Sequence, residues 1–172
     1  MAAVTTIESG YRIGLVAQVT QLHMDFYARH YGFGQQFESL VAGGLAEFCG
    51  RLDRVQNQIW SLQSAGELLG SVAIDGEDLG AGTAHLRWFI VADALQGSGM
   101  GRRLLQTALD FVDAEGFADT KLWTFSGLHA ARHLYEACGF RCVEEYRGSQ
   151  WGQEVLEQCF IRPRDPAHRL AR

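Results

Sequence analysis

The sequence predicts a single-domain α+β fold (mixed α/β), in which helices flank both faces of a sheet of about six or seven strands. Short runs of alternating apolar and polar residues are typical of strands. Longer segments repeat apolar residues every three or four positions, as amphipathic helices do. In chain order a hairpin precedes a β-α-β-α-β series, which favours a mixed, largely antiparallel sheet with one core.

The first elements are one strand and two helices. A short strand is expected within Ile13–Val19, followed by a helix from Thr20 to His30 that ends at the glycine-containing segment Tyr31–Gly34. A second helix is expected from Gln35 to Cys49. Its two central glycines weaken this prediction, because each costs about 1 kcal/mol relative to alanine. Its apolar face comprises Phe37, Leu40, Val41, Leu45 and Phe48.

Strands dominate the middle of the chain. Gln58–Gln63 and Leu68–Ile74 are expected to pair as a hairpin across the turn Ser64–Glu67. After a loop at residues 75–82, His85–Val91 is expected to form a third strand of this region.

The last part alternates helices and strands. Helices are expected at Gly99–Glu115 and Ala130–Cys138, with a strand at Lys121–Phe125 between them. Two strands, Arg141–Arg147 and Glu154–Ile161, complete the sheet.

Composition bounds the class of protein. The 172 residues, 47% of them hydrophobic, suffice for one domain, expected at residues 5–162 with an irregular tail at 163–172. The net charge of -5 argues against nucleic-acid binding. With no long apolar run and no secretory signal, we expect no membrane association and a cytoplasmic location.

The four cysteines (Cys49, Cys138, Cys142 and Cys159) form no C-x-x-C pair. No histidines are spaced around them as a zinc site requires. We expect buried, reduced thiols and no metal site.

A glycine-rich turn carries the clearest chemical signal. The apolar strand ending at Val91 leads into Gly97-Ser98-Gly99-Met100-Gly101, which opens directly onto a helix. Free N–H groups and the positive end of the helix dipole favour phosphate oxygens there. The turn lacks the G-K-[ST] of a P-loop and the G-x-G-x-x-G of a dinucleotide fold. On spacing alone, a connection without a ligand remains an alternative.

Two motifs resemble those of one enzyme family. Gln96-x-x-Gly99-x-Gly101 is similar to the Q/R-x-x-G-x-G/A signature of the GNAT superfamily of acetyl-CoA-dependent N-acyltransferases. The segment Ala131–Phe140 resembles the family's A-x-x-L-Y-x-x-x-G-F helix and turn, in the expected order. The resemblance covers roughly residues 10–161. It implies a GNAT-like fold and transfer of an acetyl group from acetyl-CoA to a primary amine of a small molecule or peptide.

More narrowly, the chain resembles the acetyltransferase half of bacterial fusions in which a MarR-type winged helix precedes a GNAT domain. The resembling stretches include Phe26–Gly32, Phe37–Ala42 and Leu122–Thr124. Because only about ten residues precede the domain, we expect no winged helix and no DNA-binding role.

The resemblance also implies the cofactor site. In the family, the glycine-rich turn holds the pyrophosphate of coenzyme A, and the fourth strand pairs with the pantetheine arm, beside a splay from the fifth. The implied cofactor-binding residues are Phe89, Ile90, Val91, Gln96, Gly97, Ser98, Gly99, Met100, Gly101 and Arg102. Many members place an Asn near the end of the fifth strand. Here Thr124, Ser126 or the backbone could replace that contact.

Tyr135 matches the tyrosine with which the family protonates the departing thiolate. A phenol with a pKa of about 10 can donate a proton at neutral pH. The alternative is a core tyrosine on the apolar face of its helix. The general base that deprotonates the amine is left undecided. It is either a chain of waters or one of the side chains Glu38, His23, His85 and Arg87.

Two further questions stay open at this level. The four tryptophans, Trp60, Trp88, Trp123 and Trp151, could line an acceptor pocket, although such rings more often pack in a core. A non-catalytic acyl-CoA-binding sensor or regulatory module is the alternative function. By analogy with the family, a homodimer is also expected.

Overall fold

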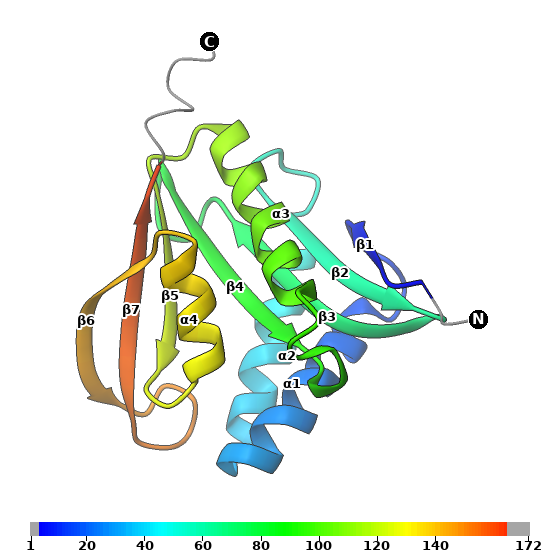
Figure 1. Ribbon diagram of the computed structural model, residues 1–172, viewed down its shortest axis with the longest axis vertical. Coiled ribbons are helices and arrows are strands. Elements are labelled where there is room, and N and C mark those ends of the chain that lie inside the picture. The colour runs from blue at the N-terminus through cyan, green and yellow to red at the C-terminus, as the bar shows by residue number, and fades with distance from the viewer. Residues whose placement is uncertain (1–3, 165–172) are drawn as a thin grey trace.

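The computed structural model describes residues 4–164, which form one seven-stranded sheet of order β1-β2-β3-β4-β5-β7-β6 (Figure 1). All neighbouring strands are antiparallel except β4 and β5. The fold is thus a mixed, mostly antiparallel sheet in a single domain, as predicted. The strands are β1 (Thr6–Ser9), β2 (Gln58–Ser64), β3 (Glu67–Asp75), β4 (Thr83–Val91), β5 (Asp119–Phe125), β6 (Arg141–Gly148) and β7 (Val155–Pro163).

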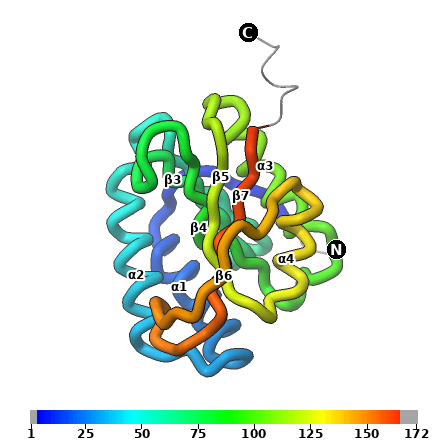
Figure 2. Tube along the Cα trace, turned by 90° about the vertical axis from the view of Figure 1, so that its left-hand side faces the viewer, coloured from blue at the N-terminus to red at the C-terminus, as the bar shows by residue number. Residues whose placement is uncertain are grey.

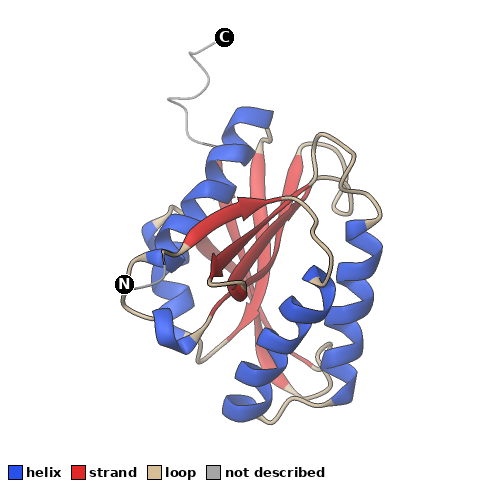
Figure 3. Ribbon diagram, turned by 90° about the vertical axis from the view of Figure 1, so that its right-hand side faces the viewer, coloured by secondary structure: helices blue, strands red, loops and turns tan. Residues whose placement is uncertain are grey.

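Helices cover both faces of the sheet (Figure 3). The helices α1 (Leu15–Tyr31) and α2 (Gln35–Cys49) lie on one face, and α3 (Met100–Glu115) and α4 (His129–Ala137) lie on the other. Two clusters of buried side chains fill the space between the sheet and the helices on each face. Leu15, Leu45 and Phe48 belong to the cluster under α1 and α2, whereas Leu104 and Phe160 belong to the cluster under α3 and α4. The two faces are called below the α1/α2 face and the α3/α4 face.

The strand expected within Ile13–Val19 is wrong, because helix α1 begins at Leu15. Gly14, with a φ of 88°, lets the chain turn into the helix. Leu15, Val19 and His23 then follow at intervals of four residues and are all buried. The helical periodicity of this longer segment outweighs the strand preference of its two valines.

Three smaller corrections concern the edges. Strand β1 was not predicted; it is short, mostly exposed and pairs only with β2 among the described strands. Pro163, expected in the tail, belongs to β7, while residues 165–172 of that tail lie outside the described residues. Leu40 is half exposed and does not belong to the buried face of α2.

Helix α2 continues through Gly43 and Gly44 because one of them permits a close approach. A Cβ atom at Gly44 would lie 3.1 Å from the indole of Trp88 and 3.2 Å from the guanidinium of Arg87. Glycine therefore lets α2 pack closely on β4 at the place where β4 is irregular. Its cost in helix propensity is offset by this packing.

The cysteines are free thiols, but only Cys159 is buried; Cys49, Cys138 and Cys142 are half-buried, contrary to expectation. Within residues 4–164, none of the helices combines the length and the apolar character that a membrane crossing demands.

Candidate active site

Strand β4 contains a bulge in its second half. Ala73 of β3 pairs with Arg87 and Ser71 pairs with Ile90, so the single residue between them on β3 faces both Trp88 and Phe89. Trp88 has a φ of +48°, which is unusual for a bulky residue. The Ser71 hydroxyl supports it by donating a 2.7 Å hydrogen bond to the Trp88 carbonyl oxygen.

The bulge changes which face the side chains occupy. Arg87 and Trp88 both lie on the α1/α2 face, near Gly44 of α2. Phe89 then packs on the α3/α4 face. No local pattern indicates this bulge, because the residues from His85 to Val91 are typical of an ordinary apolar strand.

Beyond His85, β4 and β5 separate (Figure 1). Their parallel pairing comprises three pairs, from Thr83↔Asp119 to His85↔Lys121. Both strands continue, to Val91 and Phe125, without pairing to each other within the described residues. The β5-facing edge of Phe89, Ile90 and Val91 therefore offers backbone groups to a ligand. This is the splay expected from the resemblance.

The glycine-rich turn lies at the open end of this gap, between β4 and α3. Gly97 and Gly99 have φ values of 77° and 82°, and a Cβ atom at either would meet no atom within 4 Å. Among the described residues, their N–H groups donate no hydrogen bond. The N–H groups of the first turn of α3 also have no partner inside the helix. The turn thus leaves the N–H groups of Gly97 and Gly99 free, and such groups suit phosphate oxygens.

Side-chain and backbone bonds keep the turn in shape. Ser98 donates to the Leu95 carbonyl oxygen through its N–H and its hydroxyl, at 3.2 and 2.5 Å. Gln96 donates from Nε2 to Asp93 at 3.2 Å. Arg102 and Arg103 are both exposed, as expected for cations beside a phosphate site. Met100 is half-buried against the core.

Tyr135 lies under the gap on the α3/α4 face. Its ring centroid is 5.8 Å from that of Phe89 in β4 and 6.0 Å from that of Phe160 in β7. Only 5% of the residue is exposed. Burial raises the pKa of its phenol further above the ordinary value, so the hydroxyl stays protonated at neutral pH. Tyr135 is therefore a core residue of the α3/α4 face whose hydroxyl keeps its proton.

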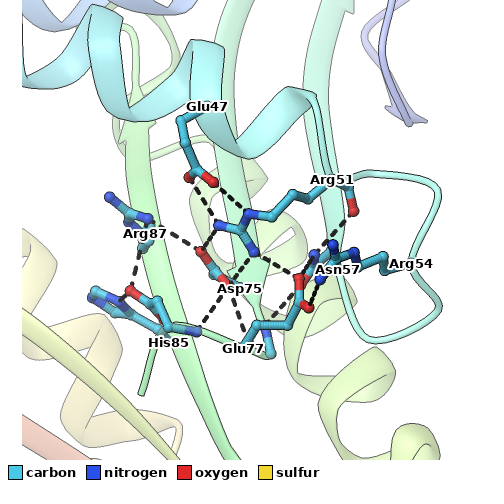
Figure 4. Close-up of polar contacts among 10 residues, drawn as sticks. Glu47, Arg51, Arg54, Asn57, Asp75, Glu77, His85 and Arg87 are labelled. Carbon is cyan, nitrogen blue, oxygen red and sulfur yellow. Dashed lines mark hydrogen bonds and ion pairs between the residues drawn. The ribbon is translucent and has the colours of Figure 1, made fainter. Parts of the chain in front are cut away.

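A polar cluster occupies the α1/α2 face where β4 and β5 are still paired (Figure 4). At its centre, Arg51 donates to Asp75 at 2.7 and 3.1 Å, to Glu77 at 2.7 Å and to Glu47 at 2.6 Å. Burial favours a higher pKa for Asp75, but the hydrogen bonds and charge of Arg51, together with the N–H groups of Glu77 and Asp78, outweigh it and keep the pKa below its usual value. Bonds from Asn57, Arg51 and Arg54 lower the pKa of Glu77 to about 2. The cluster fixes the end of α2 to the sheet.

Two of the candidate bases, His85 and Arg87, form hydrogen bonds within this cluster. The Nδ1 atom of His85 lies 2.6 Å from Asp78, and Arg87 donates to Asp75 at 3.2 Å (Figure 4). Arg87 additionally covers the Trp88 ring at 4.0 Å. A guanidinium held by a carboxylate makes a poor proton acceptor, which removes Arg87 from the set of bases.

The two remaining candidates lie in helices α1 and α2. His23 is buried, its Nδ1–H donates to the Val19 carbonyl oxygen at 2.8 Å, and burial lowers its pKa to about 4. Glu38 is exposed in the first turn of α2. The structure therefore does not bring the four candidate bases together.

Sequence reasoning missed a cavity on the α1/α2 face. It has a volume of about 380 Å³ and is lined by Trp123, Tyr146, Gly148, Ser149, Gln150 and Glu157. Of the four tryptophans, Trp123 is the one that lines this space. Trp60 packs in the core, Trp88 supports α2, and Trp151 contacts Phe125. A signal was present, since a glutamate stands in the apolar strand 155–163.

The turn between β6 and β7 closes one side of the α1/α2 face (Figure 2). Gln153 donates from Nε2 to the Gly32 carbonyl oxygen at 2.6 Å, which ties this turn to the end of α1. Trp151 lies 5.7 Å from Phe125, centroid to centroid. The face opposite Tyr135 is thus bordered by helices on one side and by this turn on the other.

The site thus combines a splayed pair of strands with a glycine-rich helix N-terminus, an arrangement that suits an elongated, phosphorylated ligand. Residues 16–140 match the profile of the acetyltransferase (GNAT) family, and the chain belongs to that family. A 90-residue stretch is 30% identical to N-acetyltransferase family 8 member 3 of Rattus norvegicus. That stretch is 51% of this chain and 40% of the relative, so the match spans less than half of the relative's length.

Solved structures share the fold. The yncA protein of Salmonella typhimurium, solved with its cofactor acetyl-CoA, has a TM-score of 0.75 and 17% identity, with 94% of this chain and 95% of that chain covered. A GNAT acetyltransferase of Staphylococcus aureus gives 0.74 and 12%, covering 94% and 100%. The ribosomal-protein-S18-alanine N-acetyltransferase of Escherichia coli gives 0.67 and 19%, covering 93% and 94%.

Proposed function

We propose that this protein is an N-acetyltransferase that transfers the acetyl group of acetyl-CoA to a primary amine of a small molecule or peptide by direct attack. The observation that carries the proposal is the gap between β4 and β5, which begins after His85 and leads to the glycine-rich turn. Family membership and the acetyl-CoA bound in the similar yncA protein support this assignment.

The residues of the turn fit coenzyme A. The N–H groups of Gly97, Gly99, Gly101 and Arg102 would receive the pyrophosphate, with the exposed Arg102 guanidinium beside them. The N–H groups of Ser98 and Met100 donate within the turn and would hold its shape. Gln96 supports this turn through Asp93. The free edge of Phe89, Ile90 and Val91 would pair with the amides of the pantetheine arm. Thr124, which lies on the α3/α4 face of β5, could supply the contact that Asn makes in many members.

The bound thioester supplies an activated acetyl group, and the chain handles the protons. Tyr135 keeps its proton in a buried site and donates it to the departing thiolate. The amine loses its proton before attack, either to water or to His85, whose Nδ1 is held by Asp78. No acyl-enzyme forms in this scheme.

A thiol-release assay with acetyl-CoA and a panel of primary amines tests the proposal. Turnover that depends on the amine is the expected result. Tight binding of acetyl-CoA with no thiol release for any amine would favour the non-catalytic sensor. The narrower likeness to MarR-type fusions, a cytoplasmic location and a homodimer stay predictions of the sequence, and size-exclusion chromatography with light scattering tests the last.

A further inference from the structure

The cavity lined by Trp123, Tyr146 and Glu157 adjoins the gap between β4 and β5. Trp123 follows the last β4–β5 pair by two residues, and its ring makes an edge contact with His85 at 5.1 Å. It also forms one wall of the cavity. A molecule in the cavity therefore lies on the α1/α2 face, opposite Tyr135, with Trp123 between it and the paired part of the sheet.

Glu157 is the buried acidic group of this cavity, with 2% of the residue exposed. Its carboxylate accepts hydrogen bonds from the N–H and the Nε2 of Gln150, at 3.2 and 2.7 Å. Partial burial and a hydrogen bond to Glu157 raise the pKa of the Tyr146 phenol. All of these partners are neutral.

No ion pair within residues 4–164 involves Glu157. Elsewhere in the chain, buried acidic groups face arginines, as Asp75 and Asp113 do. A buried carboxylate is costly unless a cation stands opposite it. Glu144 lies close enough to Tyr146 for its charge to raise the pKa of the phenol, and it adds negative charge near the cavity. The faces of Trp123 and Tyr146 also favour a cation.

Glu157 lies one strand beyond the gap, since β7 pairs with the outer edge of β5 and Glu157 stands opposite Phe125. The amine that attacks an acetyl group must first lose its charge. A fixed carboxylate on the next strand therefore serves a second group that remains charged. On the basis of the proposed acetyl transfer, we propose that this cavity binds a second cationic group of the acceptor, so that the substrates are aliphatic diamines or similar dications.

Calorimetric titration of the whole chain with diaminobutane and with butylamine tests this proposal, each with and without saturating coenzyme A. The wild-type protein should bind diaminobutane at least about tenfold more tightly, which corresponds to about 1.4 kcal/mol. Glu157→Gln should reduce this preference to about one. Glu154→Gln is the matched control, because Glu154 lies in the same β6–β7 hairpin, is exposed and pairs with Arg147. It should retain the preference.

Tyr146→Leu is a second variant at a partly exposed position, where loss of folding is not expected. It should weaken binding of diaminobutane several-fold. Equal affinity of wild type for the two amines, or an unchanged preference in folded Glu157→Gln, would overturn the proposal. Titrations with acetyl-CoA distinguish failure of this proposal from failure of the proposed function. A protein that binds diaminobutane but not acetyl-CoA contradicts the proposed acetyl transfer alone.

Discussion

The ring of Tyr135 in α4 lies 5.8 Å from the ring of Phe89 in β4, centroid to centroid. Phe89 reaches this position because the bulge at the preceding residue returns its side chain to the α3/α4 face. The contact therefore joins the irregular strand β4 to helix α4, which carries the proposed proton donor.

Replacing Tyr135 by Phe should lower kcat by about 10²- to 10⁴-fold, the usual contribution of a positioned proton donor. The KM for acetyl-CoA should change little, because the ring and its packing remain. Steady-state kinetics with the best amine of the panel, together with a thermal melt, measures both effects. An unchanged kcat would show that Tyr135 is a core residue only.

Replacing Ser71 by Ala should weaken acetyl-CoA binding by about three- to tenfold. The variant loses the hydrogen bond to the Trp88 carbonyl oxygen, which supports the bulge and contributes about 1 kcal/mol. Calorimetry with acetyl-CoA checks this result. Ser61→Ala, at a buried serine of β2, should lower stability without affecting binding. Equal binding losses in the two variants would contradict a specific role of the bulge.

Asp113→Asn should destabilise the fold by about 3–5 kcal/mol, because it removes the carboxylate charge that faces the buried Arg162 guanidinium. Arg162 donates to the two Asp113 oxygens at 3.0 and 2.8 Å, which joins α3 to β7. Urea unfolding measures the change. Asp110→Asn, at an exposed position of the same helix, is the control and should cost little. Similar losses in both variants would refute the importance of the buried pair.

Stability should fall as the pH falls from about 6.5 to about 4, because burial lowers the pKa of His23 from 6.5 to about 4. In this window the unfolded chain binds a proton that the folded chain does not, so acid favours unfolding. The difference between the two pKa values corresponds to about 3.4 kcal/mol of stability lost across this window. Urea unfolding across this range should show a smaller slope for His23→Leu than for wild type. His133→Gln, at an exposed position, should keep the wild-type slope.

The sequence predicted most elements and the cofactor turn, since these depend on local patterns. The helix Met100–Glu115 and the turn before it follow from periodicity and glycine spacing. The predicted start of helix α1 lies too late in the sequence, because the two valines in its first turns are also typical of a strand. The bulge at Trp88 depends on contacts with Ser71 and with α2, which no local pattern encodes.

The cavity around Glu157 was missed for a related reason. Trp123 and Glu157 are far apart in the sequence and meet only because β5 pairs with β7. Tyr135 could be predicted only through the resemblance of its helix to a family motif, since its spacing fits a core residue equally well. Only the structure shows that Tyr135 lies beneath the splayed strands.

Calorimetric titration with acetyl-CoA tests the central claim, that the glycine-rich turn holds the phosphates, most directly. Gly99→Asp and Gly99→Asn form a matched pair, because both residues tolerate a positive φ and differ mainly in charge. We expect wild type to bind acetyl-CoA, Gly99→Asn to bind it more weakly, and Gly99→Asp to lose binding. Equal affinity of the Asp and Asn variants would contradict a phosphate site at this turn.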